Sequence, residues 1–541
     1  MQGAPQDWPL LVHTILDHAA RWHGDRKVVA RRADGRIART TYADVHTEAQ
    51  KITGRLVASG LAPGERVGAL CWNTDRHLSL WYGVMGAGLV HHTVNPRLFE
   101  EQISFIVNDA EDRIMFTDIT FLPLLEKLRD QLTTVRQIIV LADRADVPET
   151  SLEVTAWDDW LDGAEPHPWV SVPETAPCGM CYTSGTTGLP KGVVYSHRSN
   201  VLHALGMSVP DVLGLSARDV VMPIVPMFHA NGWSLAFSAP LNGTALVLPG
   251  AALDGASVYE LMEDEGVTFS AAVPTVWLGL FKHMESTGQR LSSLSRVVIG
   301  GSACPPAMTK KFEEIYGVEV LHAWGMTEMS PLGTVASLLP QHDSISAEDK
   351  LALKDTQGRV PYTVEMKVTD DENRELPHDG KTFGRLKVRG PAVAGAYFKN
   401  AGAENFDEDG WFDTGDVAHI SPDGFMKITD RSKDVIKSGG EWISSIDLEN
   451  LAMLHPDVAE AAVIGVPHPK WDERPLLVIV PQPGAAQDGA AILDSMRPHI
   501  AKWWLPDEVT FVSEIPHTAT GKIQKTKLRD AFQDVYKGAA A

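Results

Sequence analysis

One short stretch of this chain combines many small hydrogen-bond donors with a single positive charge. The sequence YTSGTTGLPKGVVYSH, from Tyr182 to His197, contains hydroxyl groups, glycines and one lysine. Glycines let a backbone approach a ligand closely, and consecutive backbone N–H groups form a concave site for an anion. The pattern therefore predicts a phosphate-binding loop. Its members are Thr183, Ser184, Gly185, Thr186, Thr187, Gly188 and Lys191.

This loop differs from the P-loop of many nucleotide-binding proteins. No serine or threonine follows Lys191, and the G-x4-G-K spacing is absent. Ser, Thr and Gly clusters also occur in ordinary surface loops. Here, however, the cluster separates two strand-like runs, a position that favours the binding interpretation.

Four further motifs follow the loop along the chain. They are HAWGMTE (322–328), GWFDTGD (410–416), DRSKDVIKSGGEW (430–442) and TATGKIQK (518–525). Together with the loop they resemble the signature motifs of the adenylate-forming superfamily, which includes acyl-CoA synthetases, luciferases and peptide-synthetase adenylation domains. The resemblance spans nearly the whole chain. It implies an enzyme that joins a carboxylic acid to ATP, giving acyl-AMP and pyrophosphate, and then passes the acyl group to coenzyme A.

The resemblance also implies roles for single residues in the first step. Lys522 is expected to bridge the carboxylate and the α-phosphate, while Glu328 holds Mg²⁺ with the Thr183 hydroxyl as a second ligand. Thr327 is expected to bind phosphate, and Asp416 to bind the ribose with help from Arg431. The residues expected to frame the adenine and the same edge of the nucleotide are Gly301, Ser302, His322, Ala323, Trp324 and Gly325.

A second set of expectations concerns the transfer to coenzyme A. By resemblance, Lys433 is the hinge about which a mobile C-terminal domain rotates and withdraws Lys522. Lys437, Gly440 and Trp442 would then border the coenzyme A channel, and His229 would lie between that channel and the acyl pocket.

The acid itself is expected to be short or of medium length. No acidic residue occurs from Val220 to Gly250, which argues against an amino acid as substrate, and bulky side chains at Trp233, Trp277, Met329 and Pro331 predict a shallow apolar pocket. The patterns GMTEMSPLGTV and GGEWISSIDLEN resemble medium-chain acyl-CoA synthetases and 3-methylmercaptopropionyl-CoA ligases. This favours 3-(methylthio)propionate, with a medium- or long-chain fatty acid as the alternative. Ser445 stands where many relatives have proline, which we interpret as a change in packing.

Other classes of protein remain open from the sequence. A luciferase-like oxygenase shares the adenylating half and would turn over without coenzyme A. An adenylation module would serve a carrier protein, but no carrier domain is expected before Ala541. A non-catalytic sensor of ATP or acyl groups would not need Lys522 and Glu328.

The elements that would position these residues alternate between strand and helix. Residues 65–71, 89–94 and 112–118 read as buried strands, and residues 75–88 and 98–110 as helices. This rhythm predicts an α/β fold with parallel sheets covered by helices. After Phe383 short strands dominate, with a hairpin turn at Asp423–Gly424. We expect an N-terminal domain at 1–430 with a β subdomain at 345–430, a hinge at 431–434 and a mobile α+β domain at 435–541.

Composition limits the setting in which the protein works. The chain has 541 residues, a formal net charge of −22 and four cysteines, which argue against nucleic acid as a partner and against a disulfide scaffold. Cys178 and Cys181 have CxxC spacing, but a second such pair is absent, so a structural role is expected. Without an export signal or membrane span in the sequence, we expect a cytoplasmic protein. The oligomeric state stays open, with a homodimer as one option.

Overall fold

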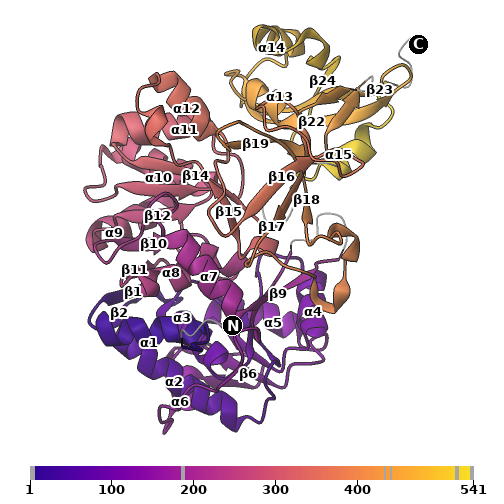
Figure 1. Ribbon diagram of the computed structural model, residues 1–541. Helices are drawn as coiled ribbons and strands as arrows, with labels where there is room; N and C mark the ends of the chain where they lie inside the picture. The colour runs from indigo at the N-terminus through magenta and orange to yellow at the C-terminus, as the bar shows by residue number, and fades with distance from the viewer. Residues whose placement is uncertain (1–5, 184–188, 432–433, 439–440, 518–522, 537–541) are drawn as a thin grey trace, which may run out of the picture. The chain divides into compact units, whose positions relative to one another are not determined.

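The computed structural model describes residues 6–183, 189–431, 434–438, 441–517 and 523–536, and it gives no side chains for residues 441 and 442. The chain divides into two compact units (Figure 1). The larger unit comprises Met1–Glu365 and Arg389–Gly410, and the smaller comprises Met366–Val388 and Trp411–Ala541.

The larger unit contains an eight-stranded sheet whose central strands are parallel. Both edge strands, β15 and β2, run antiparallel to their neighbours. In spatial order the strands are β15 (Leu332–Val335), β14 (Glu319–Gly325), β13 (Arg296–Ile299), β12 (Phe269–Ala272), β10 (Val220–Pro223), β11 (Ala245–Leu248), β1 (Lys27–Arg31) and β2 (Ile37–Thr41).

A seven-stranded sheet forms the second layer of this unit. It is parallel except for its edge strand β9, which pairs antiparallel with β8. In spatial order the strands are β7 (Val154–Ala156), β6 (Gln137–Val140), β5 (Ile114–Thr117), β3 (Arg66–Leu70), β4 (Val90–Thr93), β8 (Pro177–Tyr182) and β9 (Gly192–Ser196). The edge pair β8–β9 carries the predicted phosphate loop in its connection.

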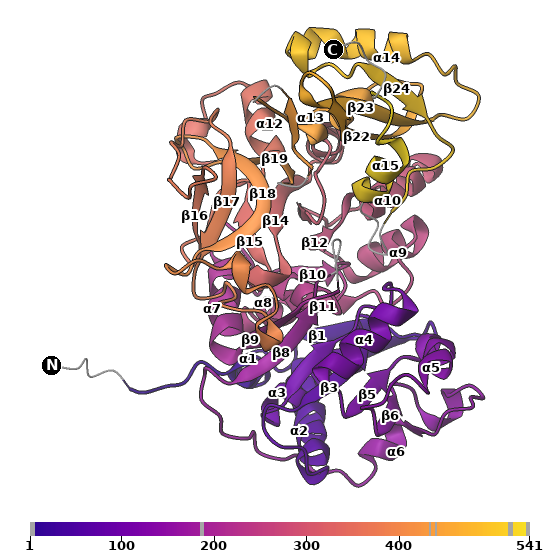
Figure 2. The ribbon, with the colours of Figure 1, turned by 90° about the vertical axis from the view of Figure 1, so that its right-hand side faces the viewer.

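Helices cover both sheets. The α-helices of the larger unit are α1 (Val12–Trp22), α2 (Tyr42–Ala58), α3 (Asp75–Gly86), α4 (Glu100–Ala110), α5 (Leu122–Leu128), α6 (Trp157–Leu161), α7 (His197–Ser208), α8 (Leu235–Leu241), α9 (Gly255–Glu265), α10 (Pro274–Thr287), α11 (Pro306–Lys310) and α12 (Ala347–Asp355). Its short helical turns are η1 (Ile119–Phe121), η2 (Arg144–Asp146), η3 (Ala230–Ser234), η4 (Lys311–Tyr316), η5 (Thr327–Met329), η6 (Pro340–His342), η7 (Phe398–Asn400) and η8 (Ala403–Asn405). Figure 2 shows α4 and α5 beside the strands of the second sheet.

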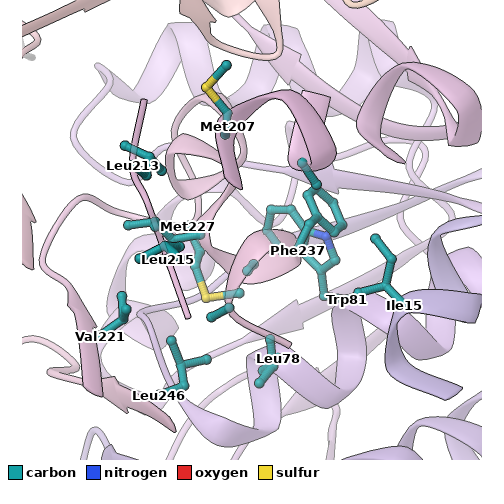
Figure 3. Close-up of a cluster of buried hydrophobic side chains, with 14 of the residues drawn as sticks. Ile15, Leu78, Trp81, Met207, Leu213, Leu215, Val221, Met227, Phe237 and Leu246 are labelled. Carbon is teal, nitrogen blue, oxygen red and sulfur yellow. The ribbon is translucent and has the colours of Figure 1, made fainter. Parts of the chain in front are cut away.

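The main core of the unit lies where α1, α3, α7 and α8 pack on one another and on strands of both sheets. Figure 3 shows part of it, including Trp81 from α3 and Phe237 from α8. These two rings meet edge to face, with centroids 5.7 Å apart. Burial of aromatic side chains dominates the energetics of such cores, so this cluster fixes the helices between the sheets.

The described residues of the smaller unit form two sheets. One is antiparallel, in the order β16 (Glu365–Thr369), β17 (Gly384–Arg389), β18 (Phe412–Ile420) and β19 (Met426–Arg431). The other joins β21 (Glu441–Ile443), β20 (Ile436–Ser438), β23 (Asp472–Pro481) and β22 (Val458–His468), with β24 (Glu508–Phe511) pairing on β23. Its helical segments are α13 (Ser445–Ala452), α14 (Gly489–Met496), η9 (Arg497–His499), η10 (Lys502–Trp504) and α15 (Lys525–Phe532).

The predicted α/β class is confirmed, with parallel sheets in a large unit followed by a smaller α+β region. The strands β3, β4 and β5 and the helices α3 and α4 form within the predicted ranges. Gly424, with a φ of +84°, turns the chain between β18 and β19 as the hairpin signal predicts. None of the helices in the described part of the chain is both long and apolar enough to cross a membrane.

Candidate active site

The two ends of the predicted phosphate loop are tied to each other. Thr183 follows β8 and Lys191 precedes β9. The Thr183 N–H donates to the carbonyl of Lys191 at 2.9 Å, and the Lys191 N–H donates to the Thr183 hydroxyl oxygen at 3.1 Å. Ser184, Gly185, Thr186, Thr187 and Gly188 lie outside the described residues.

The side chain of Lys191 lies among groups from the segment 397–404. Its ammonium is 5.1 Å from the centroid of the Tyr397 ring and 3.8 Å from Oε1 of Glu404. A Cβ atom at Gly402 would be only 2.3 Å from the Lys191 Nζ. The glycine therefore leaves the space that the ammonium occupies.

Glu328, the predicted metal carboxylate, is buried in η5. The Tyr397 hydroxyl donates to its Oε1 at 2.5 Å, and the Ala394 N–H donates to its backbone carbonyl at 2.7 Å. Tyr397 thus touches both Glu328 and Lys191. This one side chain therefore brings Glu328 and Lys191 together in the larger unit, although these two predicted site residues are far apart in the sequence.

The residues predicted to frame the nucleotide lie along the end of β14 and the loop after β13. His322 pairs in register with Ile299, and the Cys304 N–H donates to its Nε2 at 3.3 Å. Ala323 and Trp324 are buried in β14, whereas Gly325 and Ser302 are exposed, and Gly301 has a φ of +78°. Thr327 accepts a bond through its backbone carbonyl from the Tyr195 hydroxyl at 2.7 Å. These residues therefore form one edge, next to Glu328.

His229 lies directly before a strained segment. Ala230, Asn231, Trp233 and Ser234 all have positive φ values between 45° and 65°, a conformation that costs energy for residues with a side chain. The side-chain amide of Asn231 donates to Oδ1 of Asn200, in α7, at 3.3 Å. The segment that carries His229 is therefore tied to the helix that follows β9.

Trp233 lies within this segment and lines an apolar cavity. Its ring lies close to Gly300, where a Cβ atom would be 3.1 Å away. A cavity of about 10 Å³ remains, lined by Leu213, Trp233, Leu235, Phe269, Ala271, Val298 and Leu332. Met329 and Pro331 are buried next to Leu332. The expectation for Trp277 is not met, because it packs edge to face on Phe312 in a different hydrophobic cluster.

In the smaller unit, Asp416 and Arg431 form the pair that the motifs predict. They face each other across β18 and β19, and Nε of Arg431 lies 2.9 Å from Oδ1 of Asp416. Asp416 is buried while Arg431 is partly exposed. The arginine therefore compensates the charge of the carboxylate and fixes its orientation.

The remaining predicted residues of the smaller unit are only partly described. Lys437 is exposed on β20, where its N–H donates to Oε2 of Glu473 at 3.0 Å, and it pairs in register with the backbone of Trp442. Lys433, Gly440 and Lys522 lie outside the described residues, and so does the side chain of Trp442.

A buried polar network lies directly after the segment that carries Lys522. Residues 517 and 523 form a β-bridge, and the Gln524 N–H donates to the carbonyl of Pro516. The ammonium of Lys525 then contacts the Ser445 hydroxyl and lies 2.6 Å from Oε1 of Glu449. Burial raises the pKa of Glu449, although the charge of Lys525 opposes that shift.

Ser445 joins this network to the end of β19. Its N–H donates to Oδ2 of Asp430 at 2.7 Å. Proline, which has no N–H, could not make this bond. The departure from the pattern of relatives at position 445 thus changes polar contacts as well as packing.

Both cysteines of the CxxC pair are buried in β8 and unpaired. Burial raises the pKa of the Cys178 thiol to about 12, so this thiol is not a reactive nucleophile. The burial of both thiols supports the structural interpretation of the pair.

Tyr397 is the site residue that the sequence did not reveal. It belongs to the stretch GAYFKN, which has no hydroxyl cluster, charge pattern or glycine-rich loop. The sequence offers only a weak signal for a functional role here, which is an aromatic residue shortly after a turn. Its contact with Glu328 depends on the fold.

The chemistry of the two predicted metal ligands fits Mg²⁺. Glu328 and Thr183 offer oxygen atoms, which this hard cation prefers, and Mg²⁺ usually takes one or two protein ligands plus phosphate oxygens. Among the described residues, no group of three or more His, Cys, Asp or Glu side chains could hold a metal ion. A bound Mg²⁺ would therefore depend on the nucleotide for most of its ligands.

Comparison with known proteins agrees with this geometry. The family model "AMP-binding enzyme" matches residues 16–398, and "AMP-binding enzyme C-terminal domain" matches residues 447–522. A 3-methylmercaptopropionyl-CoA ligase of Ruegeria lacuscaerulensis is 48% identical over 99% of this chain and 100% of its own. A medium-chain-fatty-acid–CoA ligase of Ectopseudomonas oleovorans is 46% identical over 97% of this chain and 96% of its own.

The solved structure of the anthranilate CoA ligase AuaEII with anthranoyl-AMP has a TM-score of 0.84 to this chain, with 26% identity, and covers 98% of this chain and 99% of that one. The chain therefore belongs to the AMP-binding enzyme family, within the adenylate-forming superfamily, and it is an AMP-forming acyl-CoA ligase.

Proposed function

We propose that this ligase activates 3-(methylthio)propionate, or an acid of similar size, in two steps that use ATP, Mg²⁺ and coenzyme A. The acid attacks the α-phosphorus of ATP, which gives acyl-AMP and releases pyrophosphate. The thiol of coenzyme A then attacks the acyl carbon, which gives the thioester and releases AMP. The full-length similarity to a ligase named for this acid supports the proposal.

The residues of the larger unit would act on the triphosphate. Lys191 and the loop from Thr183 would bind phosphate oxygens, and Glu328 with Thr183 would hold Mg²⁺, which neutralises charge on the leaving pyrophosphate when bound. Local cations are needed because both reactants are anions and the chain carries a net charge of −22. Such a reaction depends on positioning and electrostatic stabilisation more than on covalent chemistry of the protein.

The residues of the smaller unit would complete the two steps. Asp416 would accept hydrogen bonds from the ribose hydroxyls while Arg431 holds its carboxylate, and Lys522 would bridge the acid and the α-phosphate. A rotation about Lys433 would then withdraw Lys522, and Lys437, Gly440, Trp442 and His229 would border the path of the incoming thiol. Hinges of this kind need only a few residues that change their backbone angles.

The full-length similarity to a ligase named for 3-(methylthio)propionate is the observation that carries the substrate assignment. The apolar cavity beside Trp233 is about 10 Å³, which is room for about one water molecule, so it would admit an acyl group only after side chains such as Trp233 moved. Trp233 is therefore the residue to vary when the acid is tested.

A medium-chain fatty acid is the second candidate. The relative from Ectopseudomonas oleovorans supports it, because its identity to this chain is only slightly lower. Rotation of Trp233 would enlarge the apolar space that Phe269 and Val298 also line.

A panel of acids tests the assignment. The purified enzyme, with ATP, Mg²⁺ and coenzyme A, is given methylmercaptopropionate, butyrate, hexanoate, benzoate or palmitate, and kcat/KM is measured for acyl-CoA formation. We expect methylmercaptopropionate to rank first and palmitate last. A first rank for hexanoate would favour the second candidate, and a first rank for palmitate would overturn both.

Two tryptophan variants show whether Trp233 sets this order. Trp233→Ala should raise kcat/KM for hexanoate relative to methylmercaptopropionate. One methylene group more or less in an apolar pocket changes selectivity by roughly 10- to 200-fold. The matched control Trp277→Phe changes a buried tryptophan outside the cavity and should keep the wild-type order. An unchanged order in Trp233→Ala would show that another residue limits the acid.

The setting of the enzyme forms part of the same proposal. A cytoplasmic location is supported by the ordinary composition of a globular protein and by the small number of cysteines. A homodimer is the oligomeric state that we would test first, by light scattering at several protein concentrations.

A further inference from the structure

Tyr397 lies between two residues that the proposed function uses. It touches the carboxylate of Glu328 through its hydroxyl and the ammonium of Lys191 through its ring. We propose that Tyr397 is a positioning residue that orients Glu328 for Mg²⁺ and holds Lys191 beside the phosphate loop. This inference rests on the proposed function, because it gives Tyr397 its role through Glu328 and Lys191.

The hydroxyl of Tyr397 directs the Glu328 carboxylate. It donates to Oε1 at a distance of 2.5 Å. A phenol O–H is a donor, and an ionised carboxylate accepts at both oxygens, with about four sites in all. The bond to Oε1 therefore restricts the rotation of the carboxylate about its last bond.

The backbone around Tyr397 fixes the same glutamate from a second side. The Ala394 N–H donates to the Glu328 carbonyl at 2.7 Å, and the Ser330 hydroxyl donates to the Ala392 carbonyl at 2.7 Å. The segment 392–397 thus holds both the main chain and the side chain of the η5 turn. Hydrogen-bond partners of a metal-binding carboxylate commonly determine its affinity in this way.

The ring of Tyr397 has a separate contact with Lys191. A cation near the face of an aromatic ring is attracted by the ring quadrupole, and Lys191 is only partly exposed. The space for its ammonium exists because position 402 is glycine. The tyrosine therefore holds the positive end of the phosphate loop on the side where Glu328 lies.

The chain after Tyr397 is anchored to the base of the same loop. Lys399 donates to Oδ1 of Asp109 at 2.9 Å, and the Tyr182 hydroxyl donates to Oδ2 of Asp109 at 2.6 Å. Tyr182 is the last residue of β8, directly before Thr183. The position of Tyr397 is thus set by the strand that begins the loop, as a positioning role requires.

The test measures metal binding rather than turnover. Binding of α,β-methylene-ATP is followed by calorimetry over a range of free Mg²⁺ concentrations, for wild type, Tyr397→Phe and the matched control Tyr362→Phe. Tyr362 is fully exposed in the same unit, so its hydroxyl should not matter. We expect Tyr397→Phe to require roughly 10- to 100-fold more Mg²⁺, the usual effect of removing such a partner. A Mg²⁺ requirement within about twofold of wild type would overturn the inference.

Two further variants separate the hydroxyl from the ring. If the hydroxyl acts through Glu328, Tyr397→Phe should have no added effect on the Mg²⁺ requirement in a Glu328→Gln background. Tyr397→Leu, which also removes the ring, should weaken nucleotide binding without Mg²⁺, whereas Tyr397→Phe should not. Additive effects of Tyr397→Phe and Glu328→Gln would contradict the proposed coupling.

A spectroscopic readout covers the case in which a variant does not fold. In otherwise wild-type protein with 3-fluorotyrosine at position 397, Mg²⁺ added to the nucleotide complex should shift the ¹⁹F signal, and Glu328→Gln should abolish the shift. An unchanged signal on addition of Mg²⁺ would overturn the inference. Failure of the proposed function would differ, because wild-type enzyme would then form no acyl-CoA from any acid.

Discussion

The ammonium of Lys191 contacts residues that lie far from it in the sequence. Tyr397 contributes the ring, Glu404 a nearby carboxylate and Gly402 the space. A lysine gains little from any one of these contacts in water. Together they restrict a flexible side chain to one side of the phosphate loop, which lowers the entropic cost of binding a triphosphate.

Gly402→Ala should disturb this arrangement. The new Cβ atom would approach the Lys191 Nζ, and the residue would keep a φ of +67°, which disfavours alanine. We expect a loss of about 1–2 kcal/mol in the free energy of unfolding and a raised KM for ATP, measured by urea denaturation and steady-state kinetics. The control Gly395→Ala places its Cβ in open space and should resemble wild type. An unchanged KM in Gly402→Ala would show that Lys191 tolerates displacement.

At the scale of elements, α13 shows how a tertiary network can oppose a local preference. Ser445 is the first residue of this helix, a position where proline is usually favoured. In this fold, however, its N–H binds Asp430 and its hydroxyl contacts Lys525. The same network links the end of β19 to the start of α15.

Ser445→Pro should therefore destabilise the protein. It removes a buried hydrogen bond to a charged acceptor, worth about 1.5–3 kcal/mol, together with the hydroxyl contact. Ser445→Ala keeps the N–H and loses only the hydroxyl, so it should lose about 1 kcal/mol. Both values come from urea unfolding of the full chain. A proline variant as stable as wild type would mean that helix preference outweighs the network.

Elements with a local signature could be predicted from the sequence. Short runs typical of buried strands reveal β3, β4 and β5, and Asp423–Gly424 reveals the hairpin between β18 and β19, because both signals are complete within a few residues. The role of Tyr397 could not be predicted, since it depends on a contact with Glu328 across the fold. Trp233 and Trp277 have equal apolar character in the sequence, and only packing separates the cavity residue from the core residue. The left-handed run after His229 carries no signal beyond the Asn231–Gly232 pair, which is typical of positive φ, and this pair does not indicate that Ala230, Trp233 and Ser234 share that conformation.

At the scale of the whole molecule, buried neutral histidines make stability depend on pH. Burial lowers the pKa of His13, His77 and His203 to about 4 and that of His197 to about 3. All four lie in the larger unit. In the unfolded chain each would take up a proton near pH 6.5.

Acidification should therefore unfold the protein. Between about pH 6.5 and pH 4 the unfolded state binds more protons than the folded state. The free energy of unfolding therefore decreases as the pH decreases, by about 1.4 kcal/mol per pH unit for each histidine that stays neutral in the folded state. Urea denaturation at pH 7.5, 6.0 and 5.0 measures the slope. The variant His203→Gln can still accept a hydrogen bond from the Leu332 N–H, and it should make the decrease of stability with acidification less steep. Equal stability at pH 7.5 and 5.0 would contradict the prediction.

The proposed division of labour between the two steps leads to a prediction for Lys522. Lys522→Ala should abolish pyrophosphate formation from acid and ATP, because the bridge between the two anions is lost. It should retain part of the thioester formation from supplied acyl-AMP, because this lysine is proposed to withdraw before that step. Release of pyrophosphate and formation of acyl-CoA are measured separately. Loss of both half-reactions would contradict separate roles for the two steps.

Exchange of labelled pyrophosphate into ATP tests the central claim most directly, because it reports formation of acyl-AMP alone and needs no coenzyme A. With Mg²⁺ and methylmercaptopropionate, the wild-type enzyme should incorporate label into ATP, and omission of the acid or the metal should stop the incorporation. If no acid of the panel supports exchange, the phosphate loop, Glu328 and Lys522 do not form the adenylating site proposed for them.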